Sequence, residues 1–150
     1  MTNVLFLDID GVLLPFGSYN WDLHKVFSKP YNYLDRMVKR TVGVEEIKRF
    51  CEEKDCKIVL ISTWRYLFEE RFLFEYLRSL GLAEYLYQTH WIAKDDTTSY
   101  RPKNYDINRW LTWQGPAAGN WWIIDDEDHG VPEGHWIKTD PYKGYVDVQS

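Results

Sequence analysis

Two aspartates separated by one residue follow an apolar run near the start of the chain. Asp8 and Asp10 come directly after residues 4–7, VLFL, and Gly11 follows them. Alternate residues of an extended chain point to the same side, and no Lys or Arg stands nearby in the sequence to neutralise these acids. Paired carboxylates of this kind favour a divalent cation. The stretch predicts a buried strand that ends in an acidic site, with an ordinary strand and Asp-Gly turn as the alternative.

The composition predicts a soluble globular protein. The chain has 150 residues, of which 45% are apolar and 27% charged, so we expect one domain over residues 1–150 with a real core. No apolar run has membrane-spanning length and the N-terminus lacks a signal peptide, which favours a cytoplasmic location without a membrane partner. Cys51 and Cys56 lack a zinc-site spacing and are expected to be reduced thiols. Nothing in the sequence indicates a stable protein partner.

Charge and aromatic content restrict the partners further. The net charge of −5 argues against a basic groove that follows a long nucleic-acid backbone, although a short end could still be recognised. Aromatic residues make up 17% of the chain, including 8 Trp and 11 Tyr. Most of these rings are needed in the core, and the remainder could form a stacking surface.

Apolar periodicity predicts that helices and strands alternate along the chain. Residues 57–61 form a second apolar run, which completes a βαβ unit with the helix expected from Val44. The other expected elements are a loop or flap at 15–30, helices at 33–40, 66–80 and 104–111, short strands at 83–88, 121–124 and 136–139, a polar loop at 92–100 and a turn at 115–120. This order predicts a single α/β unit.

Polar residues also follow two of the later strands, and such strand ends are where parallel sheets place their chemistry. Residues 125–128 are four consecutive acids after the apolar run 121–124, and they would raise one another's pKa unless a cation or hydrogen bonds compensate. Ser62 and Thr63 follow strand 57–61 and precede a helix. A solvated acidic turn and a plain helix N-cap are the alternative interpretations.

The motif DIDGVL resembles the first motif of the haloacid dehalogenase (HAD) superfamily of phosphatases and phosphotransferases. That superfamily's second motif is a Ser or Thr at the end of the neighbouring strand, which corresponds here to Ser62 with Thr63 beside it. Its fourth motif begins with a magnesium-binding Asp at a strand end, which corresponds to Asp125. The motifs stand in the order that the superfamily requires.

The third HAD motif is a Lys at or just before a helix. Lys103 is the best match because it opens the helix that leads to strand 121–124, while Lys94 and Arg101 remain rivals. A basic residue at an exposed helix start is common in proteins, so this motif gains weight only together with the others.

A narrower resemblance covers nearly the whole chain. Its motifs are similar to the small HAD domains of RNA-repair (Swiss Army Knife) proteins: DIDGVL, STWR, the helix ending in RWL, IIDDED and TDPYKGY. Those domains are thought to remove phosphates from nucleic-acid ends. The resemblance implies a three-layer Rossmannoid fold, in which helices flank a parallel sheet. A flap, a helix and a strand account for the residues between Asp10 and Ser62, so we expect a minimal cap or none, and an open site.

The resemblance and carboxylate chemistry together imply roles for the acids. Asp8 would attack phosphorus and form an aspartyl-phosphate, and Asp10 would act as general acid and then as general base. Asp8, Asp125 and the backbone carbonyl of Asp10 would bind Mg²⁺, with Asp126 as a supporting group.

The phosphoryl group needs its own partners. Ser62, Thr63 and Lys103 are expected to stabilise its oxygens, with Arg101 as a supporting cation.

The expected function is Mg²⁺-dependent hydrolysis of a phosphomonoester, either a terminal phosphate of DNA or RNA or a nucleotide. Two alternatives stay open. A small-metabolite phosphatase would share every catalytic residue, whereas an idle domain that binds a phosphorylated ligand or a partner protein would not need both Asp8 and Asp10. For a nucleic-acid end, we expect terminal bases to stack on Tyr19, Trp21 or Trp64.

Overall fold

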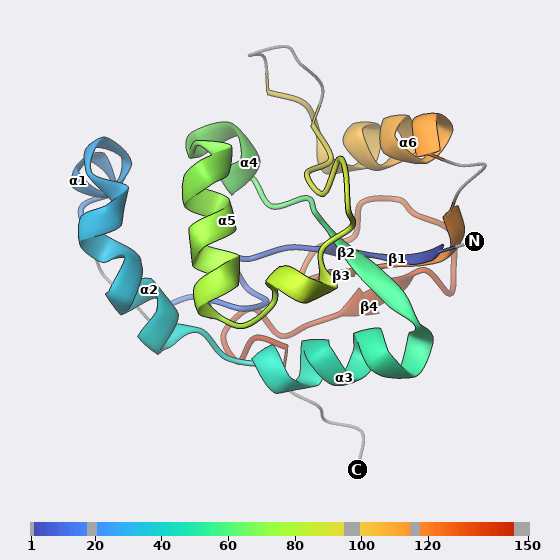
Figure 1. Cartoon of the computed structure of the whole chain (residues 1–150), viewed down its shortest axis with the longest axis horizontal. Helices are drawn as coiled ribbons and strands as arrows, with labels where there is room; N and C mark the ends of the chain where they lie inside the picture. Colours follow the sequence, from blue (N-terminus) through green and yellow to red (C-terminus); the bar gives the residue numbers. More distant parts are fainter. Residues whose placement is uncertain (1, 18–20, 95–99, 115–117, 146–150) are drawn as a thin grey trace.

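Four parallel strands form the sheet at the centre of the molecule (Figure 1). The computed structural model describes residues 2–17, 21–94, 100–114 and 118–145. The strand order is β2-β1-β3-β4, and each neighbouring pair is parallel. The strands are β1 (Thr2–Leu7), β2 (Cys56–Leu60), β3 (Ala118–Asp125) and β4 (Trp136–Lys138). This is the α/β Rossmannoid fold that the sequence predicts.

Helices cover both faces of the sheet, with α6 on one side and α3 on the other (Figure 1). The helices are α1 (Leu23–Ser28), α2 (Leu34–Arg40), α3 (Val44–Lys54), α4 (Trp64–Leu67), α5 (Glu70–Ser79) and α6 (Lys103–Gln114), with 3₁₀ turns at Pro30–Tyr33 and Ala83–Tyr85. None of the helices in the described ranges is both long and apolar enough to cross a membrane.

The alternation of side chains along β1 explains the three layers. Leu5 and Leu7 point into a core shared with α3 and α5, whereas Val4 and Phe6 point into a core shared with α6. All four side chains are fully buried. A strand buried on both faces needs apolar residues at every position, which is why VLFL shows no polar alternation.

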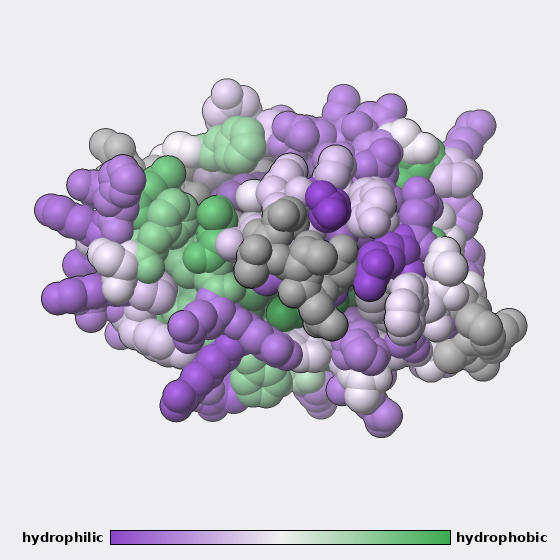
Figure 2. Space-filling model, turned by 90° about the horizontal axis from the view of Figure 1, so that it is seen from above, coloured by the Kyte–Doolittle hydropathy of each residue, from purple (hydrophilic) through white to green (hydrophobic). Residues whose placement is uncertain are grey.

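The region between β1 and β2 holds short helices and no separate cap domain among its described residues. The loop expected at 15–30 was wrong, because α1 lies within it and Asp22 caps that helix by accepting a hydrogen bond from the backbone N–H of His24 at 3.0 Å. Seen from above (Figure 2), the surface is largely hydrophilic, and one of its apolar patches lies between α1 and α4. These two helices expose Leu23, Phe27 and Leu67.

Other element boundaries differ from the sequence prediction for local reasons. The strand expected at 83–88 was wrong: a 3₁₀ turn occupies Ala83–Tyr85, and only Leu86 forms a bridge, with Ile58 of β2. The helix expected at 66–80 is divided, because Phe68 and Glu69 adopt extended backbone between α4 and α5.

Helix α6 and strand β3 are longer than predicted, whereas β4 ends one residue earlier than expected. α6 begins one residue earlier than expected and ends at Gln114, and β3 begins at Ala118, inside the turn expected at 115–120. In the polar loop expected at 92–100, Ile92 forms a bridge with Leu60 of β2, and residues 95–99 lie outside the described part.

The carboxyl ends of β1, β2 and β3 meet at one edge of the sheet. Leu7 pairs with Leu60 on one side and with Ile124 on the other. The next residues of the three strands therefore lie side by side, namely Asp8, Ile61 and Asp125. Parallel sheets place their functional groups at this edge.

Candidate active site

Three aspartates gather where β1 and β3 end. Asp8, Asp125 and Asp126 each bring one carboxylate oxygen to within 4.8 Å of the other two. Asp8 is 3% exposed and Asp125 is fully buried. The pairing of Leu7 with Ile124 causes this proximity, since Asp8 and Asp125 are the residues that follow that pair.

Lys103 lies between two of these carboxylates. Its ammonium Nζ is 3.1 Å from Asp8 Oδ2 and 2.8 Å from Asp125 Oδ2. The rival cations lie elsewhere, because Lys94 Nζ is over the ring of Tyr66 and the Arg101 guanidinium is over the ring of Tyr105. Of the three candidates for the third motif, Lys103 is therefore the one that the fold brings to the acids.

Burial and mutual charge shift the ionisation of the two buried aspartates in opposite directions. Burial raises the pKa of Asp8 well above its usual value, against the charge of Lys103, and the nearby Asp125 carboxylate adds to the increase. Burial also opposes ionisation of Asp125. The hydrogen bond from His129 and the charge of Lys103 outweigh that effect and hold the Asp125 pKa below its usual range.

The pKa values of Lys103 and Asp126 are also shifted, and both are raised. Burial alone would lower the pKa of Lys103, but Asp8 and Asp125 outweigh it, so the Lys103 pKa is raised and the ammonium is retained. Burial, followed by the contact with Asp125, raises the pKa of Asp126 to about 6. The Lys103 ammonium contacts two of the three clustered carboxylates, those of Asp8 and Asp125, so full ionisation of the cluster would leave negative charge for a further cation to balance.

The donor set fits the Mg²⁺ ion that the resemblance implies. Carboxylate oxygens from Asp8, Asp125 and Asp126 are the hard ligands that Mg²⁺ prefers. Gly11 adopts a left-handed conformation with φ of 79°, and a Cβ there would lie 2.8 Å from Asp126 Cγ. The turn after Asp10 can therefore approach the Asp126 carboxylate only because residue 11 has no side chain.

Trp64, which we expected to stack on a terminal base, instead orients the side chain of Asp10. The indole N–H of Trp64 donates a hydrogen bond to Asp10 Oδ2 at 3.0 Å. Trp64 is only 5% exposed and packs against Phe68 and Tyr76. The prediction that Trp64 stacks on a base was wrong, because a buried ring offers no face to a ligand.

The other two rings proposed for stacking give no support to that prediction. Trp21 is half-buried, packs against the apolar core and contacts Tyr33 with ring centroids 5.7 Å apart. Tyr19 lies outside the described residues.

The two hydroxyl residues after β2 occupy different positions. Ser62 is fully buried one residue before Thr63, the N-cap residue of α4, and its Oγ accepts a hydrogen bond from the backbone N–H of Trp64 at 3.1 Å. Thr63 instead lines the cleft described below. Ser62 is therefore shielded from a ligand in the cleft, whereas the Thr63 side chain is placed where it can contact one.

An open cleft of about 350 Å³ leads to the acids. We call it the Asp8 cleft. Five of the predicted site residues line it: Asp8, Asp10, Thr63, Lys103 and Asp126. Two exposed aromatic rings also line it, Phe16 at 44% and Tyr100 at 58% exposed. The cleft therefore combines a charged floor with aromatic walls.

Sequence reasoning missed three residues that hold Asp125 and its surroundings. His129 Nε2 lies 2.9 Å from Asp125 Oδ2, and the indole N–H of Trp136 donates to the backbone carbonyl of Asp125 at 3.1 Å. The Thr139 hydroxyl donates to the Gly11 carbonyl at 2.9 Å, which ties β4 to the first motif. The spacing of four residues between Asp125 and His129 was the one signal available in the sequence.

A buried arginine joins the segments that carry the second and third motifs. The Arg65 side chain is fully buried and forms an ion pair with Asp106 of α6, with Nη2 and Oδ2 2.7 Å apart. Its guanidinium also donates, at 2.6 to 3.0 Å, to the backbone carbonyls of Ile61, Ser62, Ala93 and Arg101. Arg65 therefore positions both the loop after β2 and the start of α6, where Lys103 lies.

The parallel sheet carries aspartates at its strand ends, and a lysine from a helix lies beside them at an open cleft. These features define a HAD-type domain. The chain matches the family described as "HAD domain in Swiss Army Knife RNA repair proteins" over residues 4–149, and it belongs to that family. Membership confirms the resemblance seen in the motifs and indicates a phosphatase-type hydrolase. No curated protein and no solved structure matches the chain.

The contacts of Lys103 lead to a prediction that ranks the candidate cations. Lys103→Ala should lower kcat for p-nitrophenyl phosphate by about 10²-fold or more, because an ammonium aimed at the reacting charge is lost. Lys94→Ala is the matched control and should have a smaller effect. Steady-state kinetics of the two variants, with circular dichroism to check folding, measure the difference. The reverse ranking would reassign the third motif to Lys94.

Proposed function

We propose that the domain is a Mg²⁺-dependent phosphatase that hydrolyses phosphomonoesters through an aspartyl-phosphate on Asp8. The observation that carries this proposal is the position of Lys103 Nζ, 3.1 Å from Asp8 and 2.8 Å from Asp125, beside the open cleft. A nucleophilic carboxylate, a metal-binding carboxylate and a phosphate-binding cation then act on one bound phosphoryl group.

In the first half-reaction, a carboxylate oxygen of Asp8 attacks phosphorus and the bond from phosphorus to the leaving oxygen breaks. Asp10 gives its proton to the leaving oxygen. The hydrogen bond from Trp64 holds the Asp10 carboxyl group in the orientation that this transfer needs. Lys103 and the Thr63 hydroxyl stabilise the charge on the phosphoryl oxygens.

In the second half-reaction, a water molecule attacks the phosphorus of the aspartyl-phosphate. Asp10, now ionised, takes the proton from that water, and the bond between Asp8 and phosphorus breaks. Both carboxyl groups return to their starting state and inorganic phosphate leaves. Bound Mg²⁺ would supply positive charge against the carboxylates and the phosphoryl oxygens.

Magnesium should stabilise the folded chain independently of catalysis. Because the ligand cluster is assembled only in the folded state, Mg²⁺ at one hundred times its Kd should add about 2.7 kcal/mol to the free energy of unfolding. For a chain of this size, that corresponds to roughly 5–10 °C in Tm. Thermal unfolding with and without Mg²⁺, at constant ionic strength, measures the shift.

The matched variant for the metal test is Asp125→Ala, which removes a ligand and should abolish both the Mg²⁺-induced shift in Tm and the recovery of activity after chelation. A wild-type Tm that Mg²⁺ leaves unchanged would contradict the metal assignment.

The substrate class that we propose is the terminal phosphate of a nucleic acid. Three features support this: the open cleft, its exposed rings Phe16 and Tyr100, and the description of the family as a HAD domain in RNA repair proteins. Phe16 also contacts Tyr142, which is 73% exposed, with ring centroids 5.9 Å apart. These rings replace the stacking residues expected from the sequence, because they stand at the cleft and retain exposed faces.

A substrate panel tests this proposal. We expect kcat/KM for a short oligonucleotide with a terminal phosphate to exceed that for a sugar phosphate by at least about tenfold, since each stacked base contributes roughly 1–3 kcal/mol. Oligonucleotides with 3′- and 5′-phosphates, nucleotides and sugar phosphates are compared. Phe16→Ala should lower the ratio of oligonucleotide to p-nitrophenyl phosphate efficiency. Equal efficiency on sugar phosphates and oligonucleotides would favour a small-metabolite phosphatase.

A further inference from the structure

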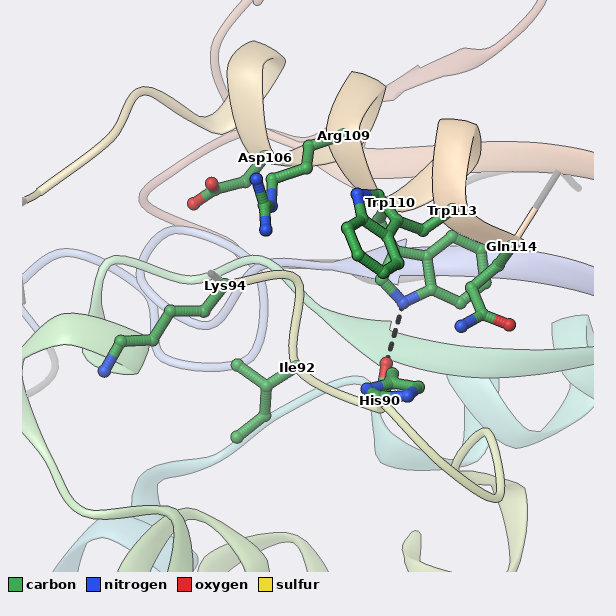
Figure 3. Close-up of a pocket in the computed structure, with 8 residues that line it drawn as sticks. All are labelled: His90, Ile92, Lys94, Asp106, Arg109, Trp110, Trp113 and Gln114. Carbon is green, nitrogen blue, oxygen red and sulfur yellow. Dashed lines mark hydrogen bonds between the residues drawn. The ribbon is translucent and has the colours of Figure 1, made fainter. Parts of the chain in front are cut away.

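A second pocket lies along α6, and none of the residues that line it lines the Asp8 cleft (Figure 3). It has a volume of about 180 Å³ and lies between α6 and the segment from His90 to Lys94. We call it the α6 pocket. Its lining includes His90 and Lys94 from that segment and Arg109 and Trp113 from α6. The catalytic proposal uses none of these four side chains.

The two tryptophans of α6 differ sharply in their surroundings. Trp110 is 5% exposed, packs edge-on against Phe6 and donates its indole N–H to the backbone carbonyl of His90 at 2.7 Å. It is part of the core and one wall of the pocket. Trp113, one turn further along, is 72% exposed. The core does not need this ring, and an exposed indole beside a pocket offers a face for stacking.

Positive charge accompanies the exposed ring. The guanidinium carbon of Arg109 lies 5.5 Å from the centre of the Trp113 ring, and Figure 3 shows the two side chains next to each other. Lys94, on the segment that faces α6, is a second cation at the pocket, and its ammonium points away from Trp113 (Figure 3) to lie over the Tyr66 ring. Their charges contrast with the net charge of −5 of the whole chain. An aromatic face with cations is the combination that binds a base and its phosphate in single-stranded nucleic acid.

A chain of contacts connects this pocket to the Asp8 cleft. Tyr100 of the cleft lies against Tyr66, with ring centroids 5.4 Å apart, and Lys94 Nζ lies 5.3 Å from the centre of the same Tyr66 ring. Along α6, Lys103 is in the cleft and Trp113 is at the pocket, about 15 Å apart at the usual rise per residue. A few nucleotides of an extended strand span such a distance.

We propose that the α6 pocket binds an internal nucleotide of a single-stranded nucleic acid whose terminal phosphate enters the Asp8 cleft. The base stacks on Trp113, and the phosphates lie against Arg109 and Lys94. The proposal rests on the nucleic-acid substrate of the proposed function and extends it: affinity comes from the strand behind the end as well as from the end itself.

Binding of an oligonucleotide without any phosphate at its ends tests the pocket separately from catalysis. The probe is a short fluorescein-labelled single-stranded oligoadenylate, and anisotropy is measured on the whole chain. Trp113→Ala should weaken binding by roughly five- to hundredfold, and Trp113→Phe should retain most of the affinity because it keeps an aromatic face. Arg109→Ala should weaken binding and reduce its dependence on salt.

The matched control is Tyr31→Ala, which removes another exposed ring, 51% exposed, from the 3₁₀ turn Pro30–Tyr33 at the α1 and α2 end of the molecule (Figure 1). It should bind the probe as the wild type does. Wild-type binding with Trp113→Ala and Arg109→Ala would overturn the proposal. Lack of phosphate release from p-nitrophenyl phosphate by the wild type would instead overturn the catalytic function, so the two failures are distinguishable.

Discussion

Replacement of Asp8 by Asn is expected to lower the turnover of p-nitrophenyl phosphate by at least about 10³-fold. The amide keeps the size of the carboxyl group but lacks the charge that attacks phosphorus and binds the metal. The fold should survive, because burial raises the Asp8 pKa and so disfavours the charge that the substitution removes. Without Mg²⁺, the Tm of the variant should equal or exceed that of the wild type. Steady-state kinetics and thermal unfolding measure both effects.

Asp35→Asn is the matched control, since it makes the same chemical change at an exposed residue of α2. Its turnover should equal that of the wild type. An Asp8→Asn variant with turnover within about tenfold of the wild type would show that another group attacks phosphorus.

Asp106→Ala should lower the free energy of unfolding by about 3–5 kcal/mol, because it leaves the buried Arg65 guanidinium without its carboxylate. Both side chains of this ion pair are fully buried. Urea unfolding measures the loss. Turnover should also fall in the folded fraction, since Arg65 positions the loop after β2 and the start of α6 that carries Lys103.

The control for Asp106→Ala is Glu75→Ala, which removes the carboxylate partner of the exposed Arg78 on α5. Its destabilisation should be much smaller, because solvent screens an exposed pair. A double variant, Arg65→Met with Asp106→Leu, should regain part of the lost stability, since it leaves no unpaired buried charge. Equal losses for Asp106→Ala and Glu75→Ala would contradict a structural role for the buried pair.

The sequence predicts the sheet and its acidic edge well because these features are local. Each central strand is an uninterrupted apolar run, and each acid follows directly after such a run, so Asp8 and Asp125 can be placed without knowledge of the rest. Lys103 was harder to choose, since Lys94 and Arg101 have similar local surroundings. Only the packing of α6 against the sheet brings the Lys103 ammonium to the carboxylates.

Features that depend on tertiary packing were not predictable from the sequence. Trp64 could be expected at the site, but its burial and its hydrogen bond to Asp10 depend on the packing of Phe68 and of Tyr76 from α5 against its ring. Arg65 binds groups up to 41 residues away, and no local pattern reveals those partners. The exposed rings Phe16 and Tyr100 could not be distinguished from core aromatics by composition, because 17% of the chain is aromatic.

Direct detection of a phosphoryl group on Asp8 is the measurement that most directly tests whether Asp8 is the nucleophile. The Asp10→Asn variant is mixed with Mg²⁺ and p-nitrophenyl phosphate and then quenched in acid. It is digested with a protease that cleaves after Lys and Arg. Since p-nitrophenolate leaves with little help from an acid, the intermediate should form, and it should accumulate without the base that activates water. We predict one phosphoryl group on Asp8, in the peptide that ends at Lys25. Phosphate release by the wild type with no phosphoryl group on Asp8 in either protein would contradict the account.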